Sequence, residues 1–314
     1  MKDRFERTIE YLRLSVTDLC NYRCIYCMNE DGIQKKTHSD ILSIEELTEI
    51  VRAAHSLKIK KVRLTGGEPL LRRGILTLCE NIKAIDPAIE LSLTTNGSLL
   101  YDMAKPLKEA GVDRINLSLD TLGPNKFRKI TRTGEIFDVM NGLKAAQLAG
   151  FEQIKINVVL MGGVNTDEIK DFAELTRYND YSVRFIELMP MNVCKGWDKS
   201  RFVSNELVLS TLKDLQKIGG DGVSRLYRMN GCKGTIGLIS PISQLFCYQC
   251  NRIRITADGF LKPCLHSEEE FPLRGLTGDD LTQAIKNGIL AKPLKHNLDC
   301  FSTQTPRDMN RIGG

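Results

Sequence analysis

Six short runs with β-strand character recur along the first 190 residues, and a longer segment with helical character separates each run from the next. Successive parallel strands require a crossover of this kind, whereas a short hairpin joins only antiparallel strands. The alternation therefore predicts parallel βα units, arranged as an open doubly wound sheet or as a partial barrel. The predicted strands are Tyr11–Val16, Lys61–Thr65, Glu90–Thr95, Arg114–Leu119, Ile154–Leu160 and Val183–Leu188.

Beyond the sixth predicted strand the alternation ends. A helix is predicted over Asn205–Lys217, and the glycines of Gly219–Gly222 are typical of a turn or linker. Asp258-Gly259 lies between alternating residues and predicts a hairpin with a two-residue turn. We therefore expect two domains, a barrel over residues 1–222 and a smaller C-terminal domain over residues 223–314.

The predicted parallel strands carry polar side chains at every second position. Strands covered by helices on both faces normally read as nearly continuous apolar runs. Here, Arg13 and Ser15 alternate with Leu12 and Leu14, which places the two pairs on opposite faces. An antiparallel sheet with one wet face would explain the pattern, but the helical crossovers argue against that topology. We therefore predict a barrel whose interior is polar because it holds a polar ligand.

Basic residues are the most common charged residues on this predicted interior face. Buried charges without partners are costly, so such a cluster requires an anion. Arginine pairs bidentately with phosphate, which makes a polyphosphate the favoured ligand, and scattered surface charges are the alternative. The basic residues concerned are Arg13, Lys61, Arg63, Lys155 and Arg184, and the lining would be extended by Arg252 and Arg254, which share a face of a later strand.

Three of the ten cysteines follow the first predicted strand within eight residues, as Cys20-x3-Cys24-x2-Cys27. The charged N-terminus lacks the apolar stretch of a secretory signal, so we expect a cytoplasmic protein. Disulfides rarely persist there, and clustered thiols indicate metal or redox chemistry. A structural zinc site needs a fourth ligand, for which His38 is the first candidate. Three thiolates also suit a four-iron cluster with one iron open to an exogenous ligand.

A second thiol cluster is predicted from Cys247-x2-Cys250 and Cys264. Pairing outward from the predicted hairpin turn places Cys264 opposite about Ile253, within a few residues of Cys250. A second iron–sulfur cluster with an open iron is therefore expected. A zinc site completed by His266 is the alternative.

Composition excludes several classes of protein. Apolar residues make up 42% and charged residues 26% of the chain, as in ordinary globular proteins. No stretch approaches the roughly 18 apolar residues that cross a bilayer. The net charge of +5 comes without a block of Lys and Arg. This charge is compatible with binding of an anionic small molecule. The non-enzyme alternative is a zinc-containing nucleic-acid-binding module, which would need interleaved aromatic and basic residues.

With Tyr26 before its last cysteine, the first motif is similar to the signature of the radical S-adenosylmethionine (SAM) family. Gly66–Pro69, after the second strand, resembles the family motif that receives the methionine amino group of SAM. Thr94–Gly97, Ser118–Asp120 and Glu187–Met189 also lie at C-terminal strand ends, where barrel active sites are found. The resemblance implies a partial six-stranded, TIM-like (β/α)6 barrel, in which a reduced cluster cleaves SAM to methionine and the 5′-deoxyadenosyl radical.

The C-terminal third narrows the resemblance to the radical SAM branch that begins molybdenum cofactor biosynthesis. The segments that carry it are Gly237–Pro241, Cys247–Arg254, Thr256–Gly259, Pro263–Leu265 and the Gly313-Gly314 end. This branch converts GTP to 3′,8-cyclo-7,8-dihydro-GTP by abstraction of the ribose 3′ hydrogen, and its C-terminal domain binds a second cluster. Another two-cluster radical SAM enzyme, acting on a peptide or small molecule, is the alternative.

The resemblance also implies roles, partners and site residues. Two 4Fe-4S clusters would be held by Cys20, Cys24 and Cys27 and by Cys247, Cys250 and Cys264. SAM would be contacted by Tyr26, Gly67, Ser118 and Met189. GTP would be contacted by Arg13, Arg63, Thr94, Lys155, Arg252, Ile253 and Arg254, with Lys61 and Arg184 as further candidates and Arg311 as a catalytic candidate. Expected partners are a low-potential electron donor of flavodoxin or ferredoxin type and a downstream cyclic pyranopterin monophosphate synthase, with the chain a monomer or homodimer.

Overall fold

The computed structural model describes residues 1–33, 40–296, 298 and 303–313, so His38 and Gly314 lie outside the described residues. All six predicted strands are present and run parallel to one another in chain order. Their ends differ from the predicted ends by at most one residue. They are β1 (Tyr11–Ser15), β2 (Lys61–Thr65), β3 (Glu90–Thr95), β4 (Arg114–Ser118), β5 (Lys155–Leu160) and β6 (Ser182–Glu187).

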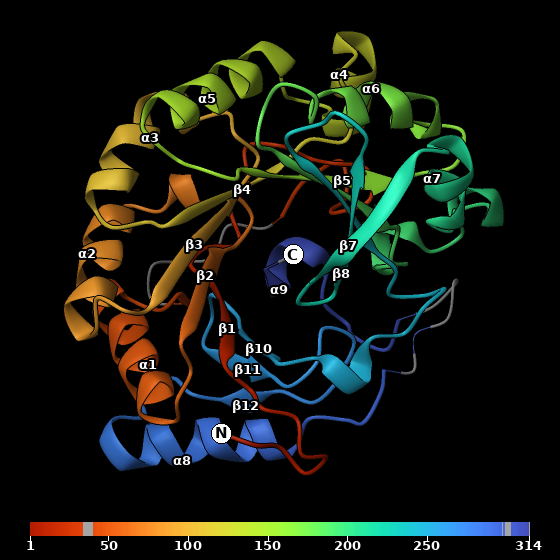
Figure 1. The fold of residues 1–314 in the computed structure, drawn as a ribbon. Helices are drawn as coiled ribbons and strands as arrows, with labels where there is room; N and C mark the ends of the chain where they lie inside the picture. The colour runs from red at the N-terminus through yellow and green to blue at the C-terminus, as the bar shows by residue number, and fades with distance from the viewer. Residues whose placement is uncertain (34–39, 297, 299–302, 314) are drawn as a thin grey trace.

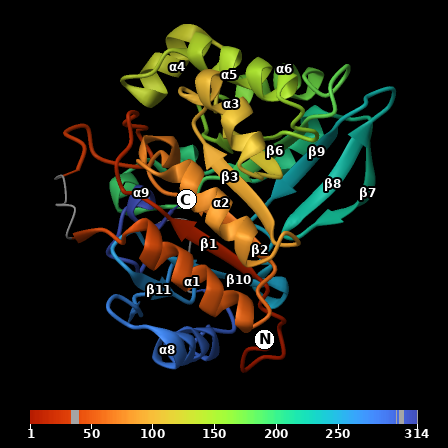
Figure 2. The ribbon, with the colours of Figure 1, turned by 90° about the vertical axis from the view of Figure 1, so that its left-hand side faces the viewer.

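Helices connect these strands and cover the outer face of the curved sheet (Figures 1 and 2). The first begins at a capping box, in which Ser43 Oγ accepts from the backbone N–H of Glu46 and the Glu46 carboxylate accepts from that of Ser43. One helix, α4, was not predicted. The helices are α1 (Ile44–Ser56), α2 (Ile75–Ile85), α3 (Leu100–Glu109), α4 (Pro124–Thr131), α5 (Ile136–Leu148) and α6 (Ile169–Glu174).

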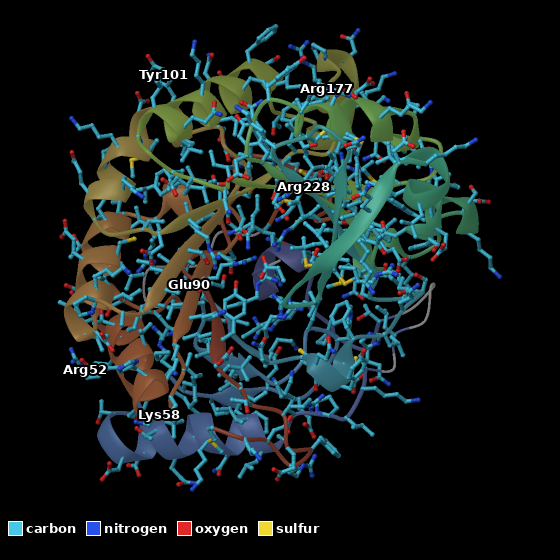
Figure 3. All side chains as sticks on the ribbon, viewed as in Figure 1. Arg52, Lys58, Glu90, Tyr101, Arg177 and Arg228 are labelled. Carbon is cyan, nitrogen blue, oxygen red and sulfur yellow. The ribbon has the colours of Figure 1, made fainter. Side chains whose placement is uncertain are left out.

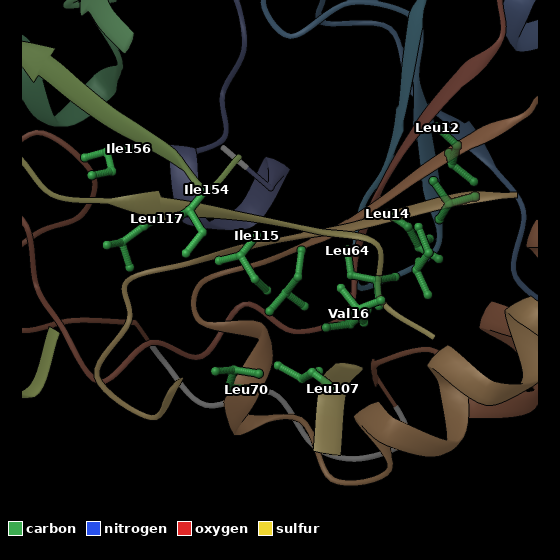
Figure 4. Packing of buried hydrophobic residues seen from close by; sticks show 14 of the residues in the cluster. Leu12, Leu14, Val16, Leu64, Leu70, Leu107, Ile115, Leu117, Ile154 and Ile156 are labelled. Atoms are coloured by element: carbon green, nitrogen blue, oxygen red, sulfur yellow. The ribbon is translucent and has the colours of Figure 1, made fainter. Parts of the chain in front are cut away.

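The apolar strand residues form the core between the sheet and these helices. Leu12, Leu14, Leu64 and Ile115 are completely buried, and Figure 4 shows them packed together. Because side chains alternate along a strand, the polar residues at the neighbouring positions point to the opposite, interior face. The predicted alternation therefore separates an apolar outer face from a polar interior. None of the helices in the described residues is long and apolar enough to cross a membrane.

C-terminal strands extend both edges of the six-stranded sheet. β10 (Arg252–Ile255) runs parallel to β1, and β9 (Thr235–Ile239) runs parallel to β6. The resulting order is β12-β11-β10-β1-β2-β3-β4-β5-β6-β9-β8-β7. The remaining elements are α7 (Glu206–Thr211), β7 (Leu215–Asp221), β8 (Ser224–Met229), β11 (Phe260–Lys262), β12 (Phe271–Pro272), α8 (Gly278–Leu290) and α9 (Met309–Ile312). A division into two domains at residue 222 stays a prediction.

Two predictions in this region were wrong at residues 212–222. The helix predicted over Asn205–Lys217 ends at Thr211, and the residues predicted as a linker pair in the β7–β8 hairpin. Gly219 has a φ of +137°, a backbone conformation that favours glycine, and it pairs with Leu226. The glycines thus permit an irregular strand, and only Gly222 lies in the turn.

The hairpin predicted at Asp258-Gly259 exists, but its loop has three residues. Thr256 N donates to Phe260 O at 2.9 Å, and Arg254 pairs with Lys262. Gly259 adopts the left-handed conformation, at φ +87°, that a three-residue loop requires at its end. The predicted two-residue turn was therefore wrong, and the register is shifted by one residue.

Candidate active site

The loop after β1 carries the first thiol group (Cys20, Cys24 and Cys27), and the Gly66–Pro69 motif holds the start of this loop. Gly67 N donates to Thr17 O at 2.9 Å, and Glu68 N donates to Leu19 O at 2.8 Å. A Cβ atom at Gly67 would lie only 2.3 Å from Leu19 O, so the close approach requires glycine. Gly67, predicted to contact SAM, therefore also positions the cysteine loop.

The first thiol group lies in surroundings that oppose ionisation of a free thiol. Burial raises the pKa of Cys20 to about 11. Burial and the neighbouring thiols raise the pKa values of Cys24 and Cys27 further. Three such thiols become thiolates together only beside a positive centre, which is what a bound metal cluster supplies. The donor set therefore fits an iron–sulfur cluster.

A cavity beside Cys24 contains two of the four predicted SAM contacts. Its lining includes Tyr26, Ser118 and Asp120. Tyr26 Oη donates to Asp120 Oδ2 at 2.7 Å, and burial raises the pKa of Asp120 to about 6. Met189, another predicted SAM contact, lies two residues beyond the end of β6.

Glu68 is a buried carboxylate that joins the second and third βα loops. It accepts hydrogen bonds from Thr95 Oγ1 at 2.8 Å and from the backbone N–H groups of Leu70 and Asn96 at 3.0 and 2.7 Å. Burial outweighs these bonds and raises the pKa of Glu68 to about 7. Glu68 belongs to a motif that the sequence singled out, but it was not among the predicted site residues.

Most of the basic residues predicted to face the interior are buried there rather than scattered over the surface, whereas Lys61 and Arg252 are partly exposed. We call Arg13, Arg63, Lys155, Arg184 and Arg254 the cationic interior. All except Arg63 are less than 9% exposed. Burial and the neighbouring arginines hold the pKa of Arg13 well below its usual range, and they lower that of Arg254 to about 10. Burial and Arg184 lower the pKa of Lys155 to about 8. This density of positive charge requires an anion.

Several predicted substrate contacts have partners within the protein. Arg63 Nε donates to Ser92 Oγ at 3.4 Å, and its guanidinium lies 5.3 Å from the Tyr11 ring centroid. Lys61, whose side chain is 40% exposed, lies 3.7 Å from Glu90, which is labelled in Figure 3. Lys61 is therefore more open to solvent than the cationic interior.

Other polar atoms of the interior have no partner within the described part of the chain. These buried atoms are Thr94 Oγ1, Asn116 Oδ1, Arg184 Nε and Arg311 Nε. A buried polar atom without a hydrogen bond is costly, so such atoms mark places where a ligand would contribute one. Thr94 and Arg184 were predicted substrate contacts and Arg311 was the catalytic candidate, whereas Asn116 was not among the predicted site residues.

The last described residues enter the barrel. In Figure 1, α9 lies at the centre of the ring of strands. Arg254 donates to Gly313 O at 2.6 Å, and Asn310 Nδ2 donates to Asp18 O at 3.1 Å. Gly313 has a φ of +79°, and a Cβ atom there would lie 2.2 Å from Thr65 Oγ1. The tail therefore connects the loop of the first thiol group to β10, and it carries Arg311 into the interior.

The second thiol group (Cys247, Cys250 and Cys264) lies beside β10 and is held by a lysine that sequence reasoning missed. Lys292 is 2% exposed, and its Nζ donates to Arg252 O at 2.8 Å and to Pro263 O at 2.9 Å. Burial opposes ionisation of Cys250, but Lys292 and Arg252 lower its pKa to about 6. The predicted substrate contact Ile253 has its side chain in the hydrophobic core, so only its backbone is available there.

Arg7 was also missed, because no motif surrounds it. It is buried beside Asp3, with Nε donating to Asp3 Oδ2 at 2.7 Å. Its remaining donors reach Cys247 O at 2.8 Å, Pro293 O at 2.7 Å and Leu294 O at 3.0 Å. Arg7 therefore attaches the loop of Cys247 to the N-terminus.

Single metal ions and four-iron clusters require different arrangements of thiols. Within the described ranges, no three Cys, His, Asp or Glu side chains are grouped around one metal ion. A four-iron cluster instead accepts each thiolate at a separate iron. His266, the alternative zinc ligand, has Nδ1 3.0 Å from Thr303 Oγ1, and its ring packs on His296.

Comparison with known proteins agrees with this site. The Radical SAM superfamily model matches residues 14–176, and the model described as Molybdenum Cofactor Synthesis C matches residues 181–298. The GTP 3′,8-cyclase of Alkaliphilus metalliredigens (strain QYMF) is 49% identical, with all of both chains covered. The GTP 3′,8-cyclase of Geobacter sulfurreducens (strain ATCC 51573 / DSM 12127 / PCA) is 45% identical, with 99% of each chain covered.

Solved structures share the fold at low sequence identity. Streptococcus suis SuiB bound to S-adenosylmethionine has a TM-score of 0.63 at 16% identity, over 92% of this chain and 67% of that chain. The enzyme anSMEcpe with bound AdoMet has a TM-score of 0.56 at 14% identity, over 93% of this chain and 81% of that chain. Both confirm the radical SAM fold. The full-length similarity to the curated relatives and the match to the superfamily model show that the chain belongs to the GTP 3′,8-cyclase family of radical SAM enzymes.

Proposed function

We propose that this chain converts GTP to 3′,8-cyclo-7,8-dihydro-GTP, the first step of molybdenum cofactor biosynthesis. The observation that carries the proposal is the cationic interior, buried within a barrel whose chain also bears two groups of three thiols. A radical SAM enzyme that modifies a peptide has no need for so many buried cations. GTP supplies the polyanion that they require.

The two thiol groups have separate roles in this proposal. The first thiol group would hold the cluster that binds SAM, and the second would hold a cluster near the guanine base. When bound, the first cluster and SAM supply the radical chemistry that removes the ribose 3′ hydrogen. The protein's own part is to hold the substrate and to exclude water from the barrel.

Arg13, Arg63, Lys155 and Arg184 would fix the triphosphate, while Arg252 and Arg254 would orient the opposite end of the substrate. Arg254 is suited to this because it faces both the interior and the thiols Cys250 and Cys264. Anchoring both ends leaves the ribose only one orientation. Positioning of this kind lowers the activation barrier of a reaction by several kcal/mol. Thr94 and Arg311 would add hydrogen bonds through atoms that have no partner in the described part of the chain.

We infer the setting of the reaction from its chemistry. A low-potential donor of flavodoxin or ferredoxin type would reduce the first cluster. A cyclic pyranopterin monophosphate synthase would consume the product, and both proteins would meet the enzyme in the cytoplasm. Whether it acts as a monomer or a homodimer can be measured by sedimentation.

The proposal is tested by anaerobic incubation with reductant, SAM and GTP deuterated at C3′. We expect deuterium in 5′-deoxyadenosine and conversion of GTP that depends on all three additions. Unlabelled 5′-deoxyadenosine, with deuterium retained in the product, would contradict the proposed abstraction. Unchanged GTP would favour the peptide-modifying alternative. About eight irons per chain are expected from metal analysis, since each cluster contains four.

A further inference from the structure

An acidic residue that sequence reasoning placed in a linker lies among the cations of the interior. Asp221 is the last residue of β7, and its Oδ2 accepts from Lys155 Nζ at 2.5 Å and also from Arg184 Nη2. The side chains of Lys155 and Arg184 are only 6% and 8% exposed, whereas that of Asp221 is 43% exposed. A single carboxylate from the surface therefore pairs with two buried cations and offsets part of their charge.

The element that carries Asp221 is peripheral to the core. β7 forms the edge of the sheet, and most of its side chains are exposed. Asp221 pairs with Ser224 across the turn of the β7–β8 hairpin, and Gly222 in that turn has a φ of +62°. Because β7 contributes little to the core, the carboxylate can withdraw without unpacking the barrel.

A second observation indicates that the cations beneath Asp221 have capacity for another anion. Arg184 Nε is buried and has no hydrogen-bond partner among the residues that the structure describes. Arg63, on β2, also interacts electrostatically with Asp221. A single carboxylate thus leaves donors unused at a point where several positive charges meet, whereas a polyphosphate could use them all.

We propose that Asp221 is a displaceable counter-anion, which occupies the polyphosphate subsite on Lys155 and Arg184 until the triphosphate of the substrate replaces it. The inference rests on the proposed function, because it takes the cationic interior as the triphosphate site. Without a counter-anion, the two buried cations would repel each other in the substrate-free enzyme. Asp221 therefore determines affinity, because every ligand of this subsite must compete with it.

The test compares the Asp221→Asn holoenzyme with the wild type by anaerobic calorimetry, without reductant. The matched control is Asp214→Asn, which removes the same charge from an exposed residue just before β7. We use GTP, inorganic triphosphate and guanosine as probes. Asp221→Asn should bind GTP and triphosphate roughly tenfold more tightly than the wild type, because an ion pair that competes with these ligands is lost. Its affinity for guanosine should not change, and Asp214→Asn should bind all three probes as the wild type does.

The outcomes separate this inference from the proposed function. If the wild type binds triphosphate but not GTP, and Asp221→Asn binds triphosphate more tightly, the counter-anion is supported while the proposed substrate is wrong. The counter-anion proposal would be overturned if Asp221→Asn bound triphosphate more weakly than the wild type or equally tightly. It would also be overturned if none of the three proteins bound triphosphate. As a second measurement, substrate-free Asp221→Asn should melt at a lower temperature than Asp214→Asn, and triphosphate should remove the difference.

Discussion

The two thiol groups contain the same donors, but Cys20 of the first and Cys250 of the second lie in opposite electrostatic surroundings, while burial raises the pKa of Cys247 as it does that of Cys20. In the first, burial raises the pKa of Cys20 to about 11, and the carboxylate of Glu68 adds to the effect. In the second, burial is outweighed by Lys292 and Arg252, which lower the pKa of Cys250 to about 6. Positive neighbours favour the more negative, reduced state of a cluster, and burial disfavours it. The surroundings of Cys250 thus favour its thiolate, whereas those of Cys20 oppose it.

The largest expected effect comes from removing one thiol from each group. Cys24→Ala should abolish reductive SAM cleavage, with a loss of about 10³-fold or more, because the cluster that supplies the electron is lost. Cys264→Ala should keep SAM cleavage but lose GTP conversion to a similar degree. Chromatography of 5′-deoxyadenosine and of the cyclised product measures both activities.

Cys79→Ala provides the control for these variants, because Cys79 is completely buried in the core on α2. It should reduce stability while both activities per folded molecule stay unchanged. Equal loss of SAM cleavage in Cys24→Ala and Cys264→Ala would mean that the two thiol groups do not have separate roles.

Thiol reactivity in cluster-free protein tests the electrostatic difference directly. Cys250 has a lowered pKa, so it is mostly thiolate above about pH 6, whereas Cys20 becomes thiolate only near pH 11. At pH 7 this gap favours Cys250 by several orders of magnitude in thiolate content, and its weaker nucleophilicity reduces the advantage to roughly 10²-fold in rate. Iodoacetamide labelling with peptide mass spectrometry measures the two rates. Equal rates at pH 7 would remove the proposed contrast.

The contrast between the sites also shows what sequence can predict. Arg13 and Arg63 were placed in the interior correctly because strand alternation is a local, two-residue pattern. Cysteine spacing likewise predicted both thiol groups. The individual contacts to SAM and GTP stay predictions, which the variants described here address.

The residues that were missed act through atoms distant in the sequence. Lys292 contacts main-chain carbonyls at residues 252 and 263, and any residue type can offer a carbonyl. Asp221 was assigned to a linker because glycine-rich segments fit both a turn and an irregular edge strand. Its pairing with Lys155 depends on how the hairpin folds back across the barrel. No local pattern contains that information.

Removing the positive charge of Lys292 should make the electrostatic surroundings of the second thiol group more like those of the first. Lys292→Met leaves two backbone carbonyls without their donor and removes the charge beside Cys250. Loss of a residue that orients ligands typically costs 10- to 100-fold in metal affinity, so we expect preferential iron loss from the second site. Iron analysis and electron paramagnetic resonance of each cluster measure this. Exposed Lys295 provides the control, Lys295→Met, and equal loss of both clusters would contradict a local role.

The smallest expected effect concerns the tail that connects the two sites. Gly313→Ala would force a Cβ atom to within 2.2 Å of Thr65 Oγ1 at a φ of +79°. Strain of this kind should weaken docking of α9 by about 1–3 kcal/mol. Hydrogen exchange of the α9 amides in the holoenzyme measures the change without unfolding the barrel.

Gly275→Ala separates strain from collision, because Gly275 has a similar φ of +76° but nothing lies within 4 Å of its added Cβ. Gly275→Ala should show only the energetic cost of a positive φ, and the hydrogen-exchange rates of the α9 amides should stay unchanged. If Gly313→Ala releases the tail, the Asn310 side chain would leave Asp18 O and the Gly313 carbonyl would leave Arg254. Both sites should then change together, since one segment contacts the loop of the first thiol group and the strand beside the second. A change at one site alone would mean that each half of the tail docks independently.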